Sequence, residues 1–199
     1  IGPGNIQGNV FGANGANLNV DKSEGLTFAY GSNADVSRKD PNRHADPAIV
    51  TCAWRYLYID PGNPTGYSAT AETTAVDPNQ WDDGSGTLQS VPTNDWTVQW
   101  WYYFTSDQRI RVHYGQNTYQ NKAEAIDAIN VDPFSSDPFL QKASLRARLV
   151  VKQGATDISD SLQAQFLASG VFGAIGGGSG GGGAGVLPHA STHYDTGGD

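Results

Sequence analysis

Three acidic residues and a tryptophan lie together in one short stretch of the chain. The stretch runs from residue 77 to residue 86, is rich in turn-forming residues, and contains Asp77, Trp81, Asp82 and Asp83. Two carboxyl groups can act as acid and nucleophile in glycoside hydrolysis, and an aromatic face can stack on a sugar ring. Carboxylates also ligate Ca²⁺, although the stretch lacks the ligand spacing of an EF-hand. The first candidate chemistry is therefore binding or cleavage of a glycan.

The crowding of these carboxyl groups argues against cleavage. In glycosidases the two carboxyl groups face each other across a cleft, about 5 to 10 Å apart, whereas Asp82 and Asp83 are adjacent. An Asp-Asp pair in a Gly-rich turn is usually part of a solvated loop, and a long surface loop often carries a binding function. We therefore keep Trp81, Asp82 and Asp83 as candidate ligand-binding residues.

Two histidines have a spacing that suits metal binding. His189 and His193 are four residues apart, so they could share one side of a helix and bind a metal together with Asp195. Pro188 and the preceding Gly-rich residues disfavour a stable helix. We favour a metal-free junction in which the two rings hydrogen-bond or stack, keep His189 and His193 as candidate metal ligands, and expect no cofactor.

Patterns for nucleophilic catalysis are missing from the sequence. There is no Gly-x-Ser-x-Gly motif, and the Gly-rich run at 176–183 lacks the Lys and Ser/Thr of a phosphate-binding loop. The single cysteine, Cys52, lies in an alternating apolar segment that predicts a buried, inert thiol. We therefore expect the protein not to be an enzyme.

The composition narrows the class of protein. Only 16% of the 199 residues are charged, Gly occupies 25 positions, and the formal net charge is -8. This balance favours a sheet-rich surface protein, and the lack of a basic cluster disfavours nucleic-acid binding. No apolar run approaches the roughly 18 to 20 residues that cross a bilayer, so we expect no membrane insertion. The chain has no Met and no closing element, so we expect a fragment of a longer polypeptide.

Alternating apolar residues predict several strands. The clearest patterns are a strand at 48–60, an extended stretch at 67–76, a hairpin at 96–114 and a strand at 145–152 with one buried and one basic face. Asn121 and Glu124 predict the start of a short helix, and residues 157–175 have helix-compatible spacing. The expected fold is mainly β, an antiparallel sheet or sandwich with one or two short helices and extended Gly-rich terminal segments.

The hairpin also suggests a contact between subunits. Trp96, Val98, Trp100 and their alternating neighbours would form the core face, which leaves Trp101 and Tyr103 on the second face of the strand. Exposed aromatic residues need a partner, and a second subunit would supply one. We therefore expect Trp101 and Tyr103 at a subunit interface.

The composition predicts four regions along the chain. Residues 1–20 form an extended segment that gains order by pairing, residues 21–175 a β-rich domain, residues 176–186 a Gly-rich linker, and residues 187–199 the start of a following junction or domain.

Together, three segments and the end of the chain resemble tailed-phage tail fibre and related appendage proteins. The segments are the aromatic strand 96–104, the stretch 112–119 and the stretch 149–156. Residues 188–199 are similar to the His-x-x-x-His-x-x-Gly-Gly-x-Asp segments that recur at junctions of phage fibre proteins. The resemblance implies a virion location, a homo-oligomer and most readily a trimer, contacts with other virion proteins, and attachment to a host glycan or protein.

Two other functions remain open from the residues. The aromatic content and low charge also suit a monomeric carbohydrate-binding module of a secreted or surface protein. A glycan-degrading appendage enzyme would use Asp77, Asp82 or Asp83 as acid or nucleophile. Our leading expectation is the non-enzymatic structural and attachment domain.

Overall fold

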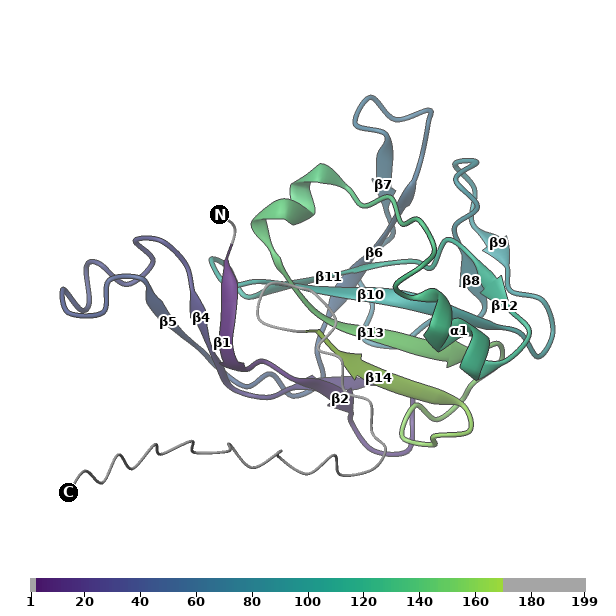
Figure 1. The fold of residues 1–199 in the computed structure, drawn as a ribbon, viewed down its shortest axis with the longest axis horizontal. Helices are drawn as coiled ribbons and strands as arrows, with labels where there is room; N and C mark the ends of the chain where they lie inside the picture. The colour runs from purple at the N-terminus through teal and green to yellow at the C-terminus, as the bar shows by residue number, and fades with distance from the viewer. Residues whose placement is uncertain (1–2, 170–199) are drawn as a thin grey trace, which may run out of the picture.

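The centre of the molecule is a seven-stranded sheet. The computed structural model describes residues 3–169. The strands follow the order β14, β13, β10, β11, β6 and β7, and β12 pairs with one end of β10 (Figure 1). They are β6 (Trp54–Ile59), β7 (Tyr67–Ala69), β10 (Trp96–Phe104), β11 (Arg109–His113), β12 (Thr118–Tyr119), β13 (Ser144–Lys152) and β14 (Ala164–Ala168). Strands β6 and β11 are parallel and the other neighbours are antiparallel, so the expected mainly β fold is confirmed, with a mixed sheet.

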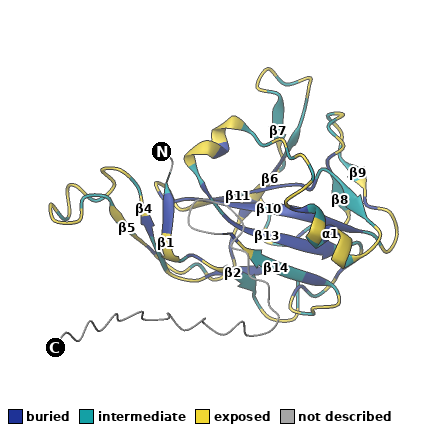
Figure 2. Cartoon of the chain, in the orientation of Figure 1, coloured by how far each residue is buried: buried dark blue, intermediate teal, exposed yellow. Residues whose placement is uncertain are grey.

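The expected hairpin forms the middle of this sheet. Strands β10 and β11 pair antiparallel, with Trp100 opposite His113 and Phe104 opposite Arg109. Strand β10 is buried along almost its whole length, because other elements cover both faces of the sheet (Figure 2). The expectation that Trp101 and Tyr103 face another subunit is therefore wrong: both side chains are 0% exposed within this one chain.

Strand β13 differs from expectation in the same way. The sequence pattern predicted a basic, solvated face for Arg146 and Arg148, yet both residues are buried. The Arg146 guanidinium donates to the backbone carbonyl oxygen of Asn9, and the Arg148 guanidinium lies 4.3 Å from the centre of the Trp100 ring. The alternating pattern predicted the position of the strand correctly. Its second face is buried because other elements cover the sheet on that side.

The N-terminal strands cover one face of the sheet. Strands β2 (Phe11–Ala13) and β3 (Val20–Lys22) form a small hairpin, and Phe11 and Val20 belong to the main apolar core. The Phe11 ring packs 5.3 Å from the Trp101 ring, measured between their centres. Residues 3–20, which the sequence marked as an extended segment in need of a partner, thus pair with other parts of the same chain.

A three-stranded arm extends from this region. Strand β4 (Gly25–Phe28) lies between β1 (Gly4–Gly8) and β5 (Arg43–Asp46), and both pairs are antiparallel. Figure 1 shows the arm and its connecting loop, residues 29–42, projecting from the left of the central sheet. We call residues 4–8 and 25–46 the arm.

Two short helical elements cover the opposite face of the sheet. Helix α1 (Lys122–Ala128) begins as predicted, because the Asn121 side chain accepts a hydrogen bond from the Glu124 amide. The 3₁₀ helix η1 (Pro138–Lys142) buries Leu140 against Tyr102 and Phe104. Residues 164–168, where the spacing also fitted a helix, form β14 instead. Residues 170–175 and the expected regions 176–186 and 187–199 lie outside the described residues.

Candidate functional site

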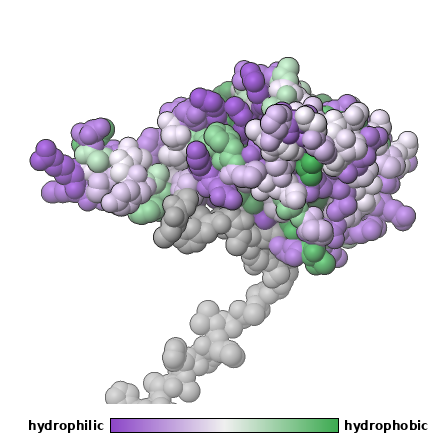
Figure 3. Space-filling model, turned by 90° about the horizontal axis from the view of Figure 1, so that it is seen from above, coloured by the Kyte–Doolittle hydropathy of each residue, from purple (hydrophilic) through white to green (hydrophobic). Residues whose placement is uncertain are grey.

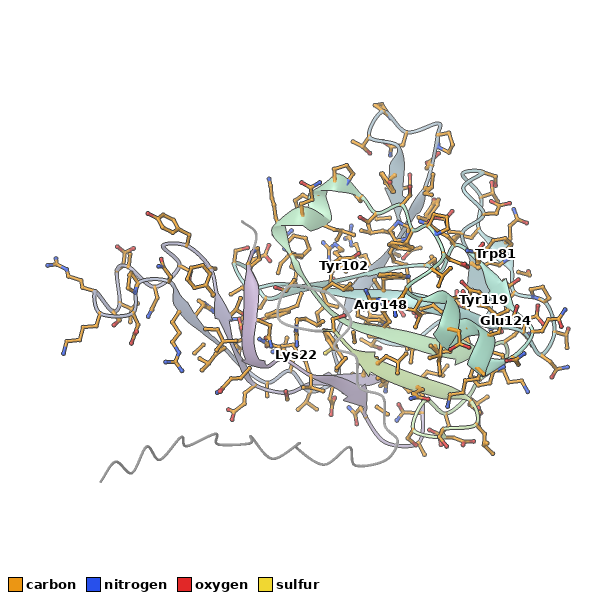
Figure 4. All side chains as sticks on the ribbon, in the orientation of Figure 1. Lys22, Trp81, Tyr102, Tyr119, Glu124 and Arg148 are labelled. Atoms are coloured by element: carbon orange, nitrogen blue, oxygen red, sulfur yellow. The ribbon has the colours of Figure 1, made fainter. Side chains whose placement is uncertain are left out.

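The acidic stretch at 77–86 contributes the first strand of a small hairpin and is therefore not a free loop. Strands β8 (Gln80–Trp81) and β9 (Gln89–Ser90) pair antiparallel, and Trp81 lies opposite Gln89. Trp81 is half-buried on this hairpin (Figure 4). The chain that follows Trp81 turns back toward the central sheet, which places Asp82 and Asp83 in very different surroundings.

Asp82 is an internal anchor of the loop. Its side chain is buried, and its Oδ2 accepts a hydrogen bond of 2.7 Å from the Ile59 amide while its Oδ1 accepts one of 2.9 Å from the Gly84 amide. The Asp82 amide in turn donates to the carbonyl oxygen of Gly115. Because both carboxylate oxygens bind backbone amides, the expectation that Asp82 contacts a ligand is wrong.

Asp83 is the exposed member of the pair. Its Oδ1 accepts a 2.9 Å hydrogen bond from the Ser85 amide, and hydrogen bonds from the side chain and backbone of Ser85 lower the pKa of Asp83. The carboxylate is therefore ionised at neutral pH and points to solvent, where it can accept hydrogen bonds from sugar hydroxyl groups. Of the two adjacent acids, Asp83 alone suits a binding role.

Asp83 lines an open groove of about 230 Å³. We call the residues around it the groove: Ile59, Asp82, Asp83, Gly84, Gln116, Asn117 and Pro133. The groove lies between the loop after β8 and the segments that follow β11 and α1. Its exposed rim combines a carboxylate with two side-chain amides, which are the groups that pair with sugar hydroxyls.

The amides of the groove are held in fixed positions. The Gln116 side chain both accepts from the Ser135 amide, at 2.9 Å, and donates to the Ser135 carbonyl oxygen. The Asn117 side chain donates to Asp132, whose same carboxylate oxygen accepts a 2.9 Å hydrogen bond from the Tyr119 hydroxyl. These contacts fix the orientation of both side chains before any ligand arrives, which lowers the entropy cost of binding.

A smaller cavity lies next to the groove. It measures about 20 Å³ and shares Gln116, Asn117 and Pro133 with the groove, while Trp100 and Phe134 form its apolar wall. Those two rings stack with 4.1 Å between their centres. About 10 to 15 Å³ is enough for one water molecule, so this cavity suits a single water rather than a ligand.

Asp77 is also held inside the structure. Its Oδ2 accepts a 2.9 Å hydrogen bond from the Tyr114 hydroxyl, and its amide donates to the Tyr56 hydroxyl at 2.9 Å. The carbonyl oxygen of Asp77 accepts from the Gln99 side chain. Asp77 therefore ties the acidic stretch to the aromatic core.

Sequence reasoning missed Gln116, Asn117 and Pro133. They follow β11 and α1, far from Asp83 in the sequence, and the fold alone brings them to the groove. The available signal was the cluster of turn-forming polar residues directly after a strongly alternating strand, a common place for binding residues.

The expected metal ligands lie elsewhere. His189, His193 and Asp195 fall outside the described residues. Within residues 3–169, no group of three or more His, Cys, Asp or Glu side chains is arranged to hold a metal ion. In the same part of the chain, no helix combines the length and the apolar character that a membrane crossing requires.

The arm carries a second surface of interest. Tyr30 is 91% exposed and Val36 87% exposed in its connecting loop, and Phe28 is exposed at the end of β4. Figure 3 shows the arm as a projection with hydrophilic residues at its tip and apolar residues closer to the body. These three exposed apolar side chains lie on an element that extends away from the core, and Val36 stands among polar residues of the connecting loop.

Comparison with known proteins adds no relative. No protein-family model matches the chain, and neither a curated protein nor a solved structure matches it.

Proposed function

We propose that this chain is a non-enzymatic structural and attachment domain of a tailed-phage virion appendage. The observation that carries the proposal is the arm: a projecting three-stranded element with exposed apolar residues. Exposed apolar side chains on an element that extends from the body are accessible to a neighbouring molecule, and contiguous apolar patches of this kind mark assembly contacts. The resemblance of the strand at 96–104 and of residues 188–199 to phage fibre proteins supports the same function.

In this proposal a neighbouring copy of the chain covers the arm. Tyr30 and Val36 then take the interface role that the sequence had assigned to Trp101 and Tyr103. A closed trimer would let each arm pack on the next subunit, so that the same contact repeats around a threefold axis. Other virion proteins would join at the ends of the chain.

Light scattering after size exclusion tests the assembly. We expect the 1–199 chain to have three times its monomer mass of 21.1 kDa, with or without a chelator. The double substitution Tyr30→Ser, Val36→Ser should yield a monomer. Leu162→Ser is a matched control, because Leu162 is 78% exposed but lies outside the arm. A wild-type monomer would contradict the assembly and favour a solitary carbohydrate-binding module.

The groove supports attachment to a host glycan. Its ionised Asp83 and its pre-oriented Gln116 and Asn117 offer acceptors and donors to sugar hydroxyls. Binding of the 1–199 chain to purified bacterial surface polysaccharides, measured by calorimetry, should fall at least tenfold in Asp83→Ala. Asp127→Ala removes an exposed acid of helix α1, outside both the groove and the arm, and should bind like wild type. Equal binding by both variants would remove the groove from the proposal.

A further inference from the structure

A lysine, an asparagine and an aspartate meet in the interior of the protein. Lys22, at the end of β3, is 1% exposed, and its Nζ lies 2.7 Å from Oδ1 of Asn9. The Asn9 side chain is fully buried, and its Nδ2 donates a 2.7 Å hydrogen bond to Oδ2 of Asp46, which is also buried. An amine, a carboxamide and a carboxylate therefore form one continuous chain of contacts.

The fold holds the asparagine in place. Asn9 follows β1 and has a backbone φ of 53°, a left-handed conformation that asparagine tolerates better than most residues. Its side chain lies against the backbone of Gly25 in β4, where an added Cβ would come within 2.5 Å of the Asn9 Cγ. The side-chain Nδ2 of Asn9 also lies within hydrogen-bond distance of the Asn5 Oδ1 and the Thr27 hydroxyl oxygen, so three acceptors surround its two N–H donors. These contacts fix which side of the Asn9 carboxamide faces the lysine.

The carboxylate is held as firmly as the asparagine. Oδ2 of Asp46 accepts from the Thr27 hydroxyl as well as from Asn9, and Oδ1 lies 3.1 Å from Nδ1 of His44. Asp46 ends β5, so the three groups come from three separate parts of the N-terminal region. Figure 4 places Lys22 where these strands meet the central sheet.

Burial makes the neutral, nucleophilic form of the Lys22 amine easier to reach than in an exposed lysine. Burial lowers the pKa of Lys22, the nearby Arg146 guanidinium lowers it further, and Asp46 and Cys52 partly oppose the shift. The Tyr103 ring, 4.5 Å from the lysine Nζ, covers the amine from the side of the core. A lysine nitrogen that loses its proton in a dry site is a good nucleophile.

We propose that Lys22 and Asn9 form an intramolecular isopeptide bond, and that Asp46 carries the proton that this reaction moves. The Lys22 Nζ and the Asn9 carboxamide are already in contact, and Asp46 already touches the nitrogen that must leave. A buried, pre-positioned pair of this kind reacts as one molecule and avoids the entropy cost of an encounter.

The reaction is a transamidation that needs no oxidant, energy source or further reagent. The lone pair of the neutral Lys22 Nζ attacks Cγ of Asn9, and the carbonyl electrons move to Oδ1. In the tetrahedral intermediate both nitrogens are bonded to the same carbon, so a carboxylate in contact with Nδ2 is within reach of Nζ. Asp46 takes one proton from Nζ and delivers it to Nδ2. The bond between Cγ and Nδ2 then breaks, the carbonyl reforms and ammonia leaves.

An open hollow lies beside the segments that hold the reacting groups. Gly8, Gly25 and Asp46 line an open hollow of about 610 Å³ on the arm. Asp46, whose carboxylate accepts a hydrogen bond from the leaving nitrogen, is one of the lining residues, and its side chain is itself 0% exposed. Release of ammonia to bulk water makes the reaction irreversible in practice.

The competing explanation is a buried, hydrogen-bonded ammonium. The Lys22 Nζ also lies 2.9 Å from the Ser23 carbonyl oxygen and 2.8 Å from the Pro47 carbonyl oxygen, so three acceptors are available for three N–H donors. A second source of ammonia loss is succinimide formation at Asn14–Gly15. The experiment must separate the isopeptide bond from both.

Mass spectrometry of the full chain makes this separation. The folded 1–199 chain is incubated until its mass is constant, denatured, and weighed intact. We expect the mass of the sequence less one ammonia. Trypsin then reports the position, because Lys22 is the first tryptic site and Arg38 the second. An isopeptide bond blocks cleavage at Lys22, so peptide 1–38 less one ammonia replaces peptide 1–22; a succinimide leaves peptide 1–22.

Three variants complete the test. Lys22→Arg and Asp46→Asn should both keep their full mass and release peptide 1–22, whereas Lys39→Arg, in an exposed position, should lose ammonia like wild type. A wild-type chain of full mass that releases peptide 1–22 in full yield would overturn the proposal, and this result needs no variant to fold. Complete bond formation in Asp46→Asn would remove Asp46 from the mechanism.

Discussion

The adjacent acids Asp82 and Asp83 should respond in opposite ways to the same substitution. Asp82→Ala deletes a buried carboxylate that accepts hydrogen bonds from the Ile59 and Gly84 amides. Asp83→Ala deletes an exposed carboxylate that accepts a hydrogen bond from the Ser85 amide. The pair isolates the effect of burial, because residue type, substitution and sequence neighbourhood are shared.

The magnitude for Asp82 follows from its two hydrogen bonds. A bond to a charged group contributes about 1.5 to 3 kcal/mol, and a buried donor left unpaired costs about 1 to 3 kcal/mol. The Ile59 amide belongs to β6 and loses its partner, whereas Gly84 is half-buried and can recruit water. Removing the carboxylate also relieves its own desolvation cost. We therefore expect Asp82→Ala to lower the free energy of unfolding by roughly 2 to 4 kcal/mol.

Urea denaturation followed by tryptophan fluorescence measures this difference. At an unchanged m-value, the shift of the midpoint gives the change in the free energy of unfolding. Asp83→Ala should keep the wild-type midpoint and lose glycan binding. If Asp82→Ala lay within about 0.5 kcal/mol of wild type, a range normal for surface substitutions, the assignment of Asp82 as an internal anchor would be wrong.

Three further substitutions test the core and the helix. Tyr56→Phe leaves the Gln99 side-chain oxygen and the Asp77 amide without the Tyr56 hydroxyl and should cost about 1 to 3 kcal/mol in urea denaturation. Burial lowers the pKa of His113 from 6.5, so below pH 6.5 the unfolded chain binds more protons than the folded chain. The free energy of unfolding should therefore decrease as the pH is lowered below 6.5, by up to about 1.4 kcal/mol per pH unit. The substitution His113→Gln should flatten this slope. Asn121→Ala should cost about 1 kcal/mol by removing the cap of α1, seen as a lower melting temperature.

Local patterns predicted the elements whose formation depends on near neighbours. The hairpin of β10 and β11 follows from alternating aromatic and β-branched residues on both sides of a short turn. The start of α1 follows from Asn121 and Glu124, which satisfy backbone groups three residues apart. In both cases the contacting residues are close in the sequence: three positions apart at the helix start, and between 5 (Phe104 and Arg109) and 13 (Trp100 and His113) positions apart in the hairpin.

Contacts with other elements determine the structure of the segments for which the sequence pattern gave a wrong prediction. The apolar residues of 157–168 fit a helical period, yet the neighbouring strand β13 offered a free edge, and β14 pairs with it along five residues. The burial of Trp101 and Tyr103 likewise depends on Phe11 and the N-terminal strands. The Gly- and Asn-rich composition of that segment did not predict that it would pack on the sheet. When both faces of a sheet are covered, all residues of a strand are buried, so alternation no longer distinguishes a buried face from an exposed one.

The cluster of Asn9, Lys22 and Asp46 had one local signal. Val20 and Lys22 are two residues apart in β3, so they share a face, and Val20 is fully buried. A lysine on the buried face of a strand requires a special partner. The local pattern could not predict that partner, because Asn9 follows β1 and Asp46 lies at the end of β5, both of which are distant from β3 in the sequence.

An isopeptide bond at this position would change how the domain carries load. A pulling force that enters through β1 would pass from Asn9 directly to Lys22, so residues 10–21 would never be stretched. Those residues include Phe11 and Val20, which cover the aromatic core of the central sheet. Closing a loop of this size with a covalent bond also restricts the unfolded chain, by about 3 kcal/mol for a loop of about 15 residues. The bond would therefore protect the layer on which the burial of Trp101 and Tyr103 depends, and it would do so without contributions from the arm surface or the groove.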